Sequence, residues 1–418
     1  MTGLPDYLRR PVRGMRDWLP QQFYALKKIE EILSNVAESF GYRRVETPVV
    51  EHFEVLSLKA GQDVINEIYY FKDKGGRDLG LRFDMTVPLA RVVSYHLDAP
   101  RPIRWYYFTK VFRYDEPQHG RYREFYQFGV ELIGSQSPRA DAEVLQLFAQ
   151  CLEEAGLHVF DIKLNDRRVV DAYLNSIGAA ENRHAVYRAL DKKLKLPREE
   201  VVSLMVNSGV SKEVAEKIYD DTVETTLEEA VLKIEKIDSA LGTFYRKLLN
   251  YLKDVDLSKF KFDMSIVRGL DYYTGMVFEA FAGDYKLAVG GGGRYDDLLE
   301  QYSGVKIPAL GFAIGVERLM ETLSLQEVER PLDYYIYIFD DDAYHYAYTI
   351  AKKLRKLGHS VVIELGDKHI KEAFEYMLKI GTKKLIIIGK RELERGVVKV
   401  KDLEKREEIE MSLSELIS

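Results

Sequence analysis

Cations, acceptors and aromatic rings alternate in residues 112–132, FRYDEPQHGRYREFYQFGVEL. The cations are the guanidinium groups of Arg113, Arg121 and Arg123. The acceptors include the side chains of Asp115, Gln127 and Glu131. A planar guanidinium matches the oxygen atoms of a phosphate or a carboxylate, and the acceptors suit an ammonium, an amide or the edge of a base. The ring of Phe125 could stack on an adenine.

The same composition also fits a surface hairpin in which arginine and glutamate side chains pair across neighbouring strands. Pro117 and the Gly120-Arg121 pair mark the loop of such a hairpin and are compatible with both interpretations. Composition alone therefore leaves a binding site and a salt-bridged surface hairpin open.

Two further stretches carry polar residues that suit a binding site. In RFDMTVPLAR, residues 82–91, we expect a strand that places Asp84 and Thr86 on one face; a strand end with an Asx-turn is the alternative. The stretch VRGLDYYTGMVFE, residues 267–279, combines Arg268 with the pair Tyr272-Tyr273. A hairpin with aromatic core residues is the alternative there.

Two glycine-containing stretches follow near the end of this half of the chain. VGGGGRYDDL, residues 289–298, is predicted to open a helix that carries Arg294 and to let the backbone approach a ligand closely. Its spacing matches neither the Walker nor the dinucleotide-binding pattern. GFAIGVERL, residues 311–319, predicts a strand followed by a helix that carries Arg318.

The elements that must position these residues follow from periodicity. Residues 21–40 have a helical spacing of apolar residues and end at Gly41. A strand over residues 42–50 contains Pro48, which favours an edge position. Short strands rich in aromatic and β-branched residues between about 66 and 135 predict an antiparallel sheet. Ser137 and Pro138 then predict the start of a helix that runs to Gly156.

The composition and periodicity of the sequence change in the later part of the chain. Residues 166–258 are charged and amphipathic at a helical period, which indicates a helical insertion. Strand character resumes in residues 259–328, so a later part of the chain is expected to complete the interrupted sheet. After Pro331, strands and helices alternate to the end, which predicts a small α/β domain with a largely parallel sheet.

Composition sets the class of protein. The 418 residues are 46% hydrophobic and 31% charged, as in soluble globular proteins, and the formal net charge of −6 argues against sequence-blind coating of nucleic acid. A single cysteine, Cys151, and eight scattered histidines predict neither a disulfide framework nor a protein-built metal site. We expect a cytoplasmic protein without a signal peptide or membrane span.

Taken in this order and spacing, the stretches resemble the histidyl-tRNA synthetase family of class II aminoacyl-tRNA synthetases, in its archaeal and eukaryotic branch. The segment VRGMRDWLP is similar to the family's opening, the Pro48 strand to class II motif 1, residues 112–132 to motif 2 and residues 311–319 to motif 3. VRGLDYYTG and GGGRYDDL resemble the two histidine-specific motifs.

This resemblance implies an α+β fold: a class II synthetase catalytic domain with an antiparallel sheet and a helical insertion, followed by a C-terminal α/β anticodon-binding domain. The implied domains are residues 1–165 and 259–328 for the two parts of the catalytic domain, 166–258 for the insertion and 331–418 for the anticodon-binding domain. A homodimer is implied by motif 1.

The resemblance also implies the reaction and its residues. ATP, with Mg²⁺, would activate L-histidine, which then passes to the 3′-terminal adenosine of tRNA(His). Arg113 and Arg268 are implied to be catalytic. The implied ATP-binding residues are Arg113, Asp115, Arg121, Phe125 and Arg318. The implied histidine-binding residues are Asp84, Met85, Thr86, Arg113, Gln127, Glu131, Arg268, Tyr272 and Tyr273.

The sequence departs from the family pattern in motif 2. Where motif 2 has a glutamate two residues after its arginine, this chain has Asp115 followed by Glu116, so either carboxylate is a candidate for the adenine amino group. A non-catalytic relative, serving as a regulatory subunit in histidine biosynthesis or as a tRNA sensor, is the alternative function. The presence of Arg113, Arg268 and Arg318 favours the enzyme.

Overall fold

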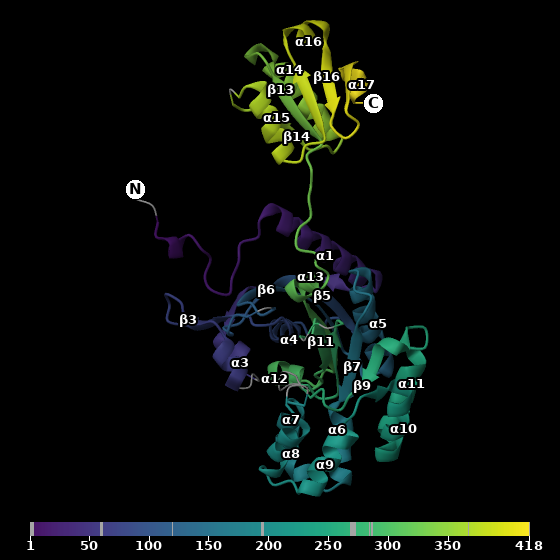
Figure 1. Cartoon of the computed structure of the whole chain (residues 1–418). Helices are drawn as coiled ribbons and strands as arrows, with labels where there is room; N and C mark the ends of the chain where they lie inside the picture. Colours follow the sequence, from purple (N-terminus) through teal and green to yellow (C-terminus); the bar gives the residue numbers. More distant parts are fainter. Residues whose placement is uncertain are drawn as a thin grey trace. The chain divides into compact units, whose positions relative to one another are not determined.

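The computed structural model describes residues 4–58, 62–118, 120–193, 196–267, 273–283, 285, 287–366 and 368–417 (Figure 1). Arg268 and Tyr272, both predicted site residues, lie outside the described residues. The chain divides into two compact units. The first comprises Met1–Leu19 with Ala25–Gln326, and the second comprises Pro20–Tyr24 with Glu327–Ser418.

A nine-stranded sheet forms the centre of the first unit. Its strands, in spatial order, are β1 (Arg43–Arg44), β5 (Ile103–Phe112), β6 (Glu124–Ile133), β12 (Ala309–Gly315), β11 (Gly290–Arg294), β10 (Met276–Phe281), β7 (Asp161–Asp166), β9 (Phe260–Phe262) and β8 (Thr225–Thr226). The neighbours from β5 to β7 are all antiparallel. The predicted antiparallel sheet, interrupted in sequence and completed by a later part of the chain, is therefore confirmed.

One face of this sheet is covered by α5 (Pro138–Glu154), which begins where the sequence predicted a helix. Ser137 caps it by accepting a hydrogen bond from the backbone N–H of Arg139 at 3.3 Å. In the core, the ring of Phe148 lies 4.8 Å from that of Phe312 and 5.2 Å from that of Phe278, measured between centroids. These contacts fix α5 against β12 and β10 and leave the opposite face of the sheet for a site.

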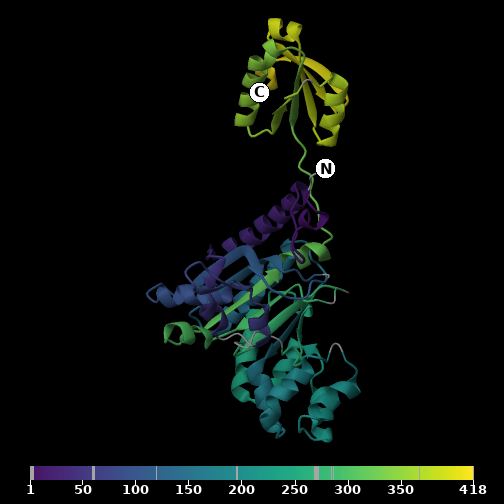
Figure 2. The same ribbon diagram turned by 90° about the vertical axis from the view of Figure 1, so that its left-hand side faces the viewer.

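Helices occupy the stretch between β7 and β9, as the helical insertion requires. They are α6 (Arg167–Ser176), α7 (Arg183–Leu190), α8 (Arg198–Val206), α9 (Lys212–Asp221), α10 (Leu227–Ile237) and α11 (Ser239–Tyr251). In Figures 1 and 2, α6 to α9 gather at one end of the sheet, at the bottom of both views. No helix of the described part of the chain has both the length and the hydropathy needed to cross a membrane.

The strand predicted over residues 82–91 is wrong. The strand β4 (Asp78–Leu81) ends before it, and α4 (Thr86–Tyr95) begins at Thr86. The buried residues of α4 include Val87, Ala90 and Val93, which recur at the spacing of a helix, and Pro88 fits its first turn because that turn needs no donor there. Thr86 consequently opens a helix, whereas Asp84 lies in the loop before it and accepts a hydrogen bond from the N–H of Val87 at 3.3 Å.

The glycine run also differs from its prediction. Residues 290–294 form the central strand β11, and the following helix, α12 (Leu298–Ser303), starts four residues later than β11 ends. A Cβ atom on Gly290 would lie 2.8 Å from the carbonyl oxygen of Ala313, and one on Gly291 would lie 2.6 Å from that of Phe278. Glycine is required here because the neighbouring strands approach too closely for any side chain.

The strand expected around Pro48 is split. Its first part is β1, which pairs in parallel with β5 and is an edge strand of the large sheet. The second part is β2 (Val50–His52), which joins β4 and β3 (Tyr70–Lys72) in a separate three-stranded sheet. Two short helices, α2 (Phe53–Ser57) and α3 (Gln62–Glu67), lie between β2 and β3. Pro48 falls between the two strands, where a missing N–H costs no ladder hydrogen bond.

The second unit is built around a five-stranded sheet in the order β14-β13-β15-β16-β17. Its elements are β13 (Tyr334–Ile338), α14 (Tyr344–Lys356), β14 (Val361–Ile363), α15 (Ile370–Lys379), β15 (Lys384–Ile388), α16 (Lys390–Arg395), β16 (Val397–Asp402), β17 (Glu407–Ser412) and α17 (Leu413–Leu416). The sheet was predicted to be largely parallel, and β13, β14 and β15 are parallel, but β16 and β17 add an antiparallel hairpin. A short turn joins β16 to β17, and such a turn can join only antiparallel strands. β15 and β16 are antiparallel as well, with α16 between them.

Candidate active site

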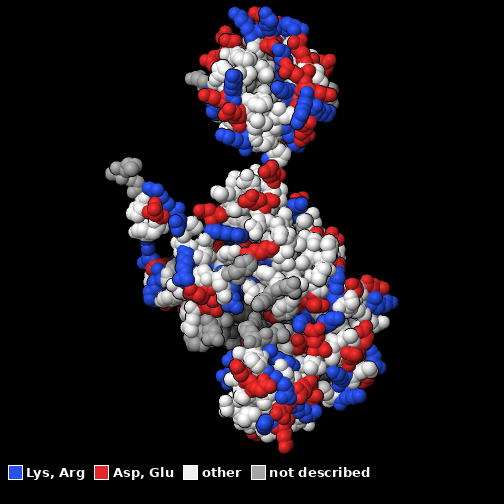
Figure 3. Space-filling model, in the orientation of Figure 1, with Lys and Arg blue, Asp and Glu red and all other residues white. Residues whose placement is uncertain are grey.

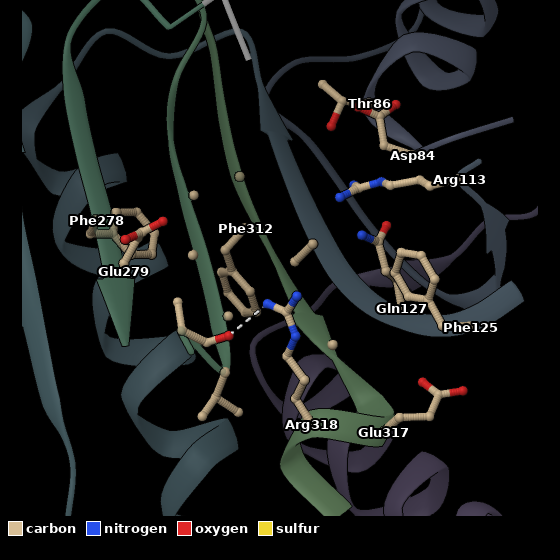
Figure 4. Close-up of a pocket in the computed structure, with 18 of the residues that line it drawn as sticks. Asp84, Thr86, Arg113, Phe125, Gln127, Phe278, Glu279, Phe312, Glu317 and Arg318 are labelled. Atoms are coloured by element: carbon tan, nitrogen blue, oxygen red, sulfur yellow. Dashed lines mark hydrogen bonds between the residues drawn. The ribbon is translucent and has the colours of Figure 1, made fainter. Parts of the chain in front are cut away.

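A polar cavity of about 270 Å³ lies against strands β6, β10, β11 and β12 of the large sheet. The residues predicted from sequence that line it are Asp84, Thr86, Arg113, Asp115, Arg121, Phe125, Gln127, Glu131, Tyr273 and Arg318. Figure 4 shows several of these side chains pointing toward one another across the cavity. Met85, which was predicted with them, does not line it. Its side chain is buried in the core with Leu89 and Tyr107.

Glu131 marks what we call the acidic end of the cavity, together with Asp84, Gln127 and Tyr273. The carboxylate of Glu131 is only 2% exposed. The hydroxyl of Thr86 donates to its Oε1 atom at 2.9 Å, and the hydroxyl of Tyr295 donates to its Oε2 atom. Burial raises the pKa of Glu131 from 4.5 to about 8, although these hydrogen bonds oppose the shift. Glu131 is therefore an acceptor whose two oxygens each receive a hydrogen bond from a fixed hydroxyl, and its protonation state changes near pH 8.

Glycine at position 311 makes room for that carboxylate. Gly311 lies opposite Glu131 in the β6–β12 pairing, and a Cβ atom there would collide with Oε2 of Glu131. The two residues are therefore matched in size across the strands.

Gln127 lies four residues before Glu131 on β6, so the two side chains share one face of the strand. Its Oε1 atom is buried and has no hydrogen-bond partner within the described part of the chain. An unsatisfied buried acceptor is costly unless a ligand supplies a donor. With the carboxylate of Asp84, which is 5% exposed, this oxygen suits a cationic N–H group such as an ammonium.

Arg113 extends from the end of β5 into the cavity between Asp84 and Gln127 (Figure 4). Its Nε atom donates to the carbonyl oxygen of Phe83 at 3.0 Å, which fixes the plane of the guanidinium. The guanidinium carbon lies 5.3 Å from the centre of the Phe125 ring. Arg113 thus stands where the acidic end meets the rest of the cavity.

We call the other part of the cavity the cationic end, defined by Arg121, Arg318 and Phe125 with Arg113 at its border. Arg318 donates to the carbonyl oxygens of Gly120 at 2.7 Å and Ala288 at 2.9 Å. Burial lowers the pKa of Arg318, and the positive charges of Arg113 and Arg121 lower it further. A polyanion bound here would relieve this repulsion, and a polyphosphate has the required charge.

The structure separates the two carboxylates that motif 2 left open. Asp115 lines the cavity and pairs with Arg121, with 3.2 Å between its Oδ2 atom and Nη1 of the arginine. Glu116 is paired instead with Arg13 of the N-terminal segment, and it does not line the cavity. Of the two carboxylates, Asp115 is therefore the one that faces the cavity.

Several cavity residues were missed by sequence reasoning. Glu317 precedes Arg318 in α13 (Val316–Thr322), and its two carboxylate oxygens accept hydrogen bonds from the backbone N–H of Tyr126 at 3.1 and 3.0 Å. Burial raises the pKa of Glu317 to about 7. This contact ties the helix that carries Arg318 to strand β6. Tyr295 and Glu279 were missed as well; Tyr295 lies in a stretch singled out for Arg294 instead.

Arg294 itself does not line the cavity. Its guanidinium is buried and pairs with Asp141 of α5, at 2.9 and 2.8 Å, and with Asp296 at 3.0 Å. Burying these charges costs free energy unless they are paired. Arg294 is therefore a structural residue, whereas its neighbour Tyr295 reaches the site.

Comparison with known proteins agrees with this geometry. A family model described as "Histidyl-tRNA synthetase" matches residues 14–319, and one described as "Anticodon binding domain" matches residues 333–418. The chain belongs to the histidyl-tRNA synthetase family. The class II synthetase fold and the C-terminal anticodon-binding domain, both expected from sequence, are therefore confirmed.

Relatives in this family match along the whole chain. A histidine–tRNA ligase of Pyrobaculum islandicum is 74% identical over 416 residues, which are 99% of each protein. One of Pyrococcus furiosus is 39% identical over 422 residues, which are 97% of each. The crystal structure of histidyl-tRNA synthetase from Nostoc sp. PCC 7120 has a TM-score of 0.83 at 25% identity and covers 97% of this chain and 98% of its own.

A structural likeness alone does not distinguish a synthetase from a regulatory relative. A structure titled as an ATP phosphoribosyltransferase regulatory subunit/histidyl-tRNA synthetase from Bacillus halodurans C has a TM-score of 0.78 at 26% identity. It covers 91% of this chain and 99% of its own. The much higher identity to the proteins named histidine–tRNA ligase favours the synthetase.

The raised pKa of Glu131 predicts a pH effect on stability. The folded protein holds this proton up to about pH 8, whereas the unfolded chain releases it above about 4.5, so stability falls as pH rises between these values. Glu131→Gln removes the titrating group. As pH rises across this window, the free energy of unfolding of the wild type should therefore fall by on the order of a few kcal/mol relative to that of the variant. Unfolding in guanidinium chloride at about pH 5 and about pH 8 measures the difference. If wild type and variant differed in free energy of unfolding by the same amount at both pH values, the prediction would be contradicted.

Proposed function

We propose that this chain is a histidine–tRNA ligase. It activates L-histidine with ATP to histidyl-adenylate and pyrophosphate, and then transfers histidine to the 3′-terminal adenosine of tRNA(His). The observation that carries the proposal is the cavity with two ends, because buried acceptors at the acidic end face three arginines at the cationic end. An amino acid and a polyphosphate need such opposite surroundings side by side.

At the acidic end, the side chain of histidine is recognised by Glu131. An imidazole has a nitrogen atom at two positions of its ring, and a buried acceptor on one side rejects analogues that lack the matching donor. Asp84 and the orphaned oxygen of Gln127 hold the α-ammonium, and Thr86 orients Glu131. Tyr273 takes the other side of the ring. The histidine-binding roles of Tyr272 and Arg268 are proposed from the family resemblance alone.

At the cationic end, ATP lies with its adenine on Phe125 and its phosphates on the arginines. Arg113 holds the α-phosphate, and Arg121 and Arg318 hold the β- and γ-phosphates. The Asp115 carboxylate accepts from the adenine amino group. The carbonyl contacts of Arg113 and Arg318 support these roles, since they fix each guanidinium before the ligand arrives.

The first step needs alignment and charge neutralisation more than acid–base chemistry. The carboxylate of histidine attacks the α-phosphorus of ATP, a new P–O bond forms, and the bond to pyrophosphate breaks. Arg113 borders both ends of the cavity, so it neutralises charge that develops on the α-phosphate during this attack. Arg268 is proposed as the second catalytic arginine. In the second step, a ribose hydroxyl of the tRNA attacks the acyl carbon, and its proton passes to the adenylate phosphate or to the substrate itself. The bond between the acyl carbon and the phosphate oxygen breaks, and AMP leaves.

One carboxylate of the cavity wall fits a Mg²⁺ ion that would be held mainly by ATP. The described residues contain no cluster of three or more side chains that would hold a metal ion by themselves. Mg²⁺ commonly binds through substrate phosphates and one or two carboxylates, and Glu279 on the cavity wall opposite Arg318 is such a carboxylate (Figure 4). When bound, the ion would neutralise phosphate charge.

The remaining assignments rest on family membership. We propose a cytoplasmic homodimer, catalytic parts at residues 1–165 and 259–328, the insertion at 166–258, and tRNA anticodon binding by residues 331–418. On the face drawn in Figure 3, acidic and basic side chains are intermixed over both units. Charge on that face therefore does not single out where the tRNA binds, and individual tRNA contacts are left unassigned.

Charging of a tRNA transcript tests this proposal. The purified full chain is incubated with ATP, labelled histidine and a tRNA(His) transcript, with a transcript for another amino acid as the control. We expect labelled histidine on the tRNA(His) transcript alone, released by mild base as an ester is. Binding of histidine without any labelled tRNA would overturn the proposal and favour the regulatory or sensing alternative.

A further inference from the structure

A short segment, Tyr273–Gly275, leads from the acidic end of the cavity into strand β10. The sheet holds it from one side. The backbone N–H of Thr274 donates to the carbonyl oxygen of Arg294 at 2.7 Å, and the Thr274 hydroxyl accepts from the N–H of Asp296 at 3.0 Å. The buried pairs of Arg294 with Asp141 and Asp296 fix that side in turn.

Arg167, at the start of the helical insertion, holds the same segment from the other side. This arginine is the first residue of α6. Its backbone N–H donates to the carbonyl oxygen of Gly275 at 3.1 Å, and its Nη1 atom donates to that of Tyr273 at 2.9 Å. A charged donor makes the second bond stronger than one between neutral groups. Both ends of the segment are thus attached to the start of the insertion.

The rest of the insertion holds the Arg167 side chain. The guanidinium carbon lies 5.4 Å from the centre of the Tyr187 ring in α7. The Tyr187 hydroxyl in turn donates to Asp171 of α6 at 2.7 Å, and burial raises the pKa of that hydroxyl. The orientation of Arg167 therefore depends on how α6 and α7 pack together.

Helix stability does not explain an arginine at this position. The first turn of α6 contains no acidic residue, and the positive end of a helix dipole disfavours a cation there. Asp166, the N-cap, accepts from the N–H and the guanidinium of Arg168. The hydrogen bond from Arg167 to the carbonyl oxygen of Tyr273, by contrast, is strengthened by the positive charge of the guanidinium.

Tyr273 connects this arrangement to the ligand. Its side chain lines the cavity, and the negative charges of Glu131 and Asp84 act on its hydroxyl. We infer that Arg167 is a positioning residue, which fixes Tyr273 at the acidic end and makes histidine binding depend on the packing of α6 against α7. The inference rests on the proposed function, because it assigns histidine to this end of the cavity. It adds a residue outside the cavity wall to those that determine affinity for the amino acid.

Four variants of the full chain test the inference by steady-state pyrophosphate exchange, with separate KM values for histidine and ATP. Arg167→Ala removes the side-chain donor. Arg167→Lys keeps the positive charge but replaces the planar guanidinium by an ammonium. Tyr187→Ala removes the aromatic ring that orients the Arg167 side chain. Arg198→Ala is the matched control. Arg198 also belongs to the insertion and lies 5.5 Å from a tyrosine ring, that of Tyr219, but it pairs with Asp220 rather than with the β10 segment.

We expect Arg167→Ala to raise the KM for histidine about tenfold and to change that for ATP by less than about twofold. Arg167→Lys should recover part of the loss, Tyr187→Ala should give a smaller rise in the same direction, and Arg198→Ala should match the wild type. A purely structural role would instead lower kcat or change both KM values together, and either result would overturn the inference.

Two outcomes remain distinguishable from these. If Arg167→Ala fails to fold, as judged by its melting curve, an unchanged KM for histidine in Tyr187→Ala overturns the inference and a raised one supports it. If the wild type binds histidine without exchange, the proposed function fails. The same comparison of variants, made on histidine dissociation constants from calorimetry, then decides the role of Arg167.

Discussion

Replacing Arg113 with alanine is expected to lower kcat/KM for histidine-dependent pyrophosphate exchange by about a thousandfold or more. Arg113 borders both ends of the cavity, and its Nε atom is held by the carbonyl oxygen of Phe83 at 3.0 Å. A guanidinium fixed in advance stabilises charge that develops on the α-phosphate without any reorganisation cost. Arg113→Lys should lose about a hundredfold, because an ammonium cannot donate to Phe83 and the phosphate in the same plane.

Arg139→Ala is the control for this prediction. Arg139 is an exposed residue in the first turn of α5, outside the cavity lining, and exchange needs no tRNA. It should retain wild-type activity. An Arg113→Ala variant that folds normally and keeps more than about a tenth of wild-type kcat/KM would refute the role of this arginine.

The second large effect concerns the amino acid. Glu131→Gln should raise the KM for histidine about a hundredfold and leave the KM for ATP within about twofold of the wild type. Thr86 and Tyr295 each donate to one carboxylate oxygen of Glu131. The assay is run above about pH 8, where Glu131 is ionised. An amide has a single oxygen, so one of these hydroxyls would then face an N–H₂ group, and the acceptor that the carboxylate offers to the imidazole would be lost. Titration of exchange rate against each substrate measures both constants.

Glu143→Gln provides a matched control for this variant. Glu143 in α5 also accepts from a tyrosine hydroxyl, that of Tyr42 at 3.2 Å, and pairs with Arg104 at 2.8 Å, but it does not line the cavity. Its replacement should cost stability without changing either KM. If Glu131→Gln kept the wild-type KM for histidine, Glu131 would not be the group that recognises the imidazole.

Much of the site could be predicted because it lies on a local structure with a clear pattern. Residues 112–132 form the end of β5, a loop and β6, and alternate residues of a strand share one face. This period places Phe125, Gln127 and Glu131 together on the cavity side. The family resemblance supplied roles that spacing alone could not, since the same residues also fit a salt-bridged hairpin.

What could not be predicted depends on distant neighbours. Glycine is depleted in strands, so the glycine run was predicted to open a helix within a region of strand character. The close packing of β11 between β10 and β12 appears only in the folded sheet. The bond from Tyr295 to Glu131 joins residues 164 positions apart. Residues 82–91 were predicted to form a strand with Asp84 and Thr86 on one face, whereas buried residues at helical spacing determine α4.

Pyrophosphate exchange by the purified full chain with each of the twenty amino acids tests the central claim most directly. The account predicts ATP-dependent exchange with histidine alone, because only histidine offers an imidazole to Glu131 and an α-ammonium to Asp84 and Gln127. Exchange with a different amino acid would contradict the assignment of the acidic end. Histidine binding with no exchange at all would contradict the enzyme itself.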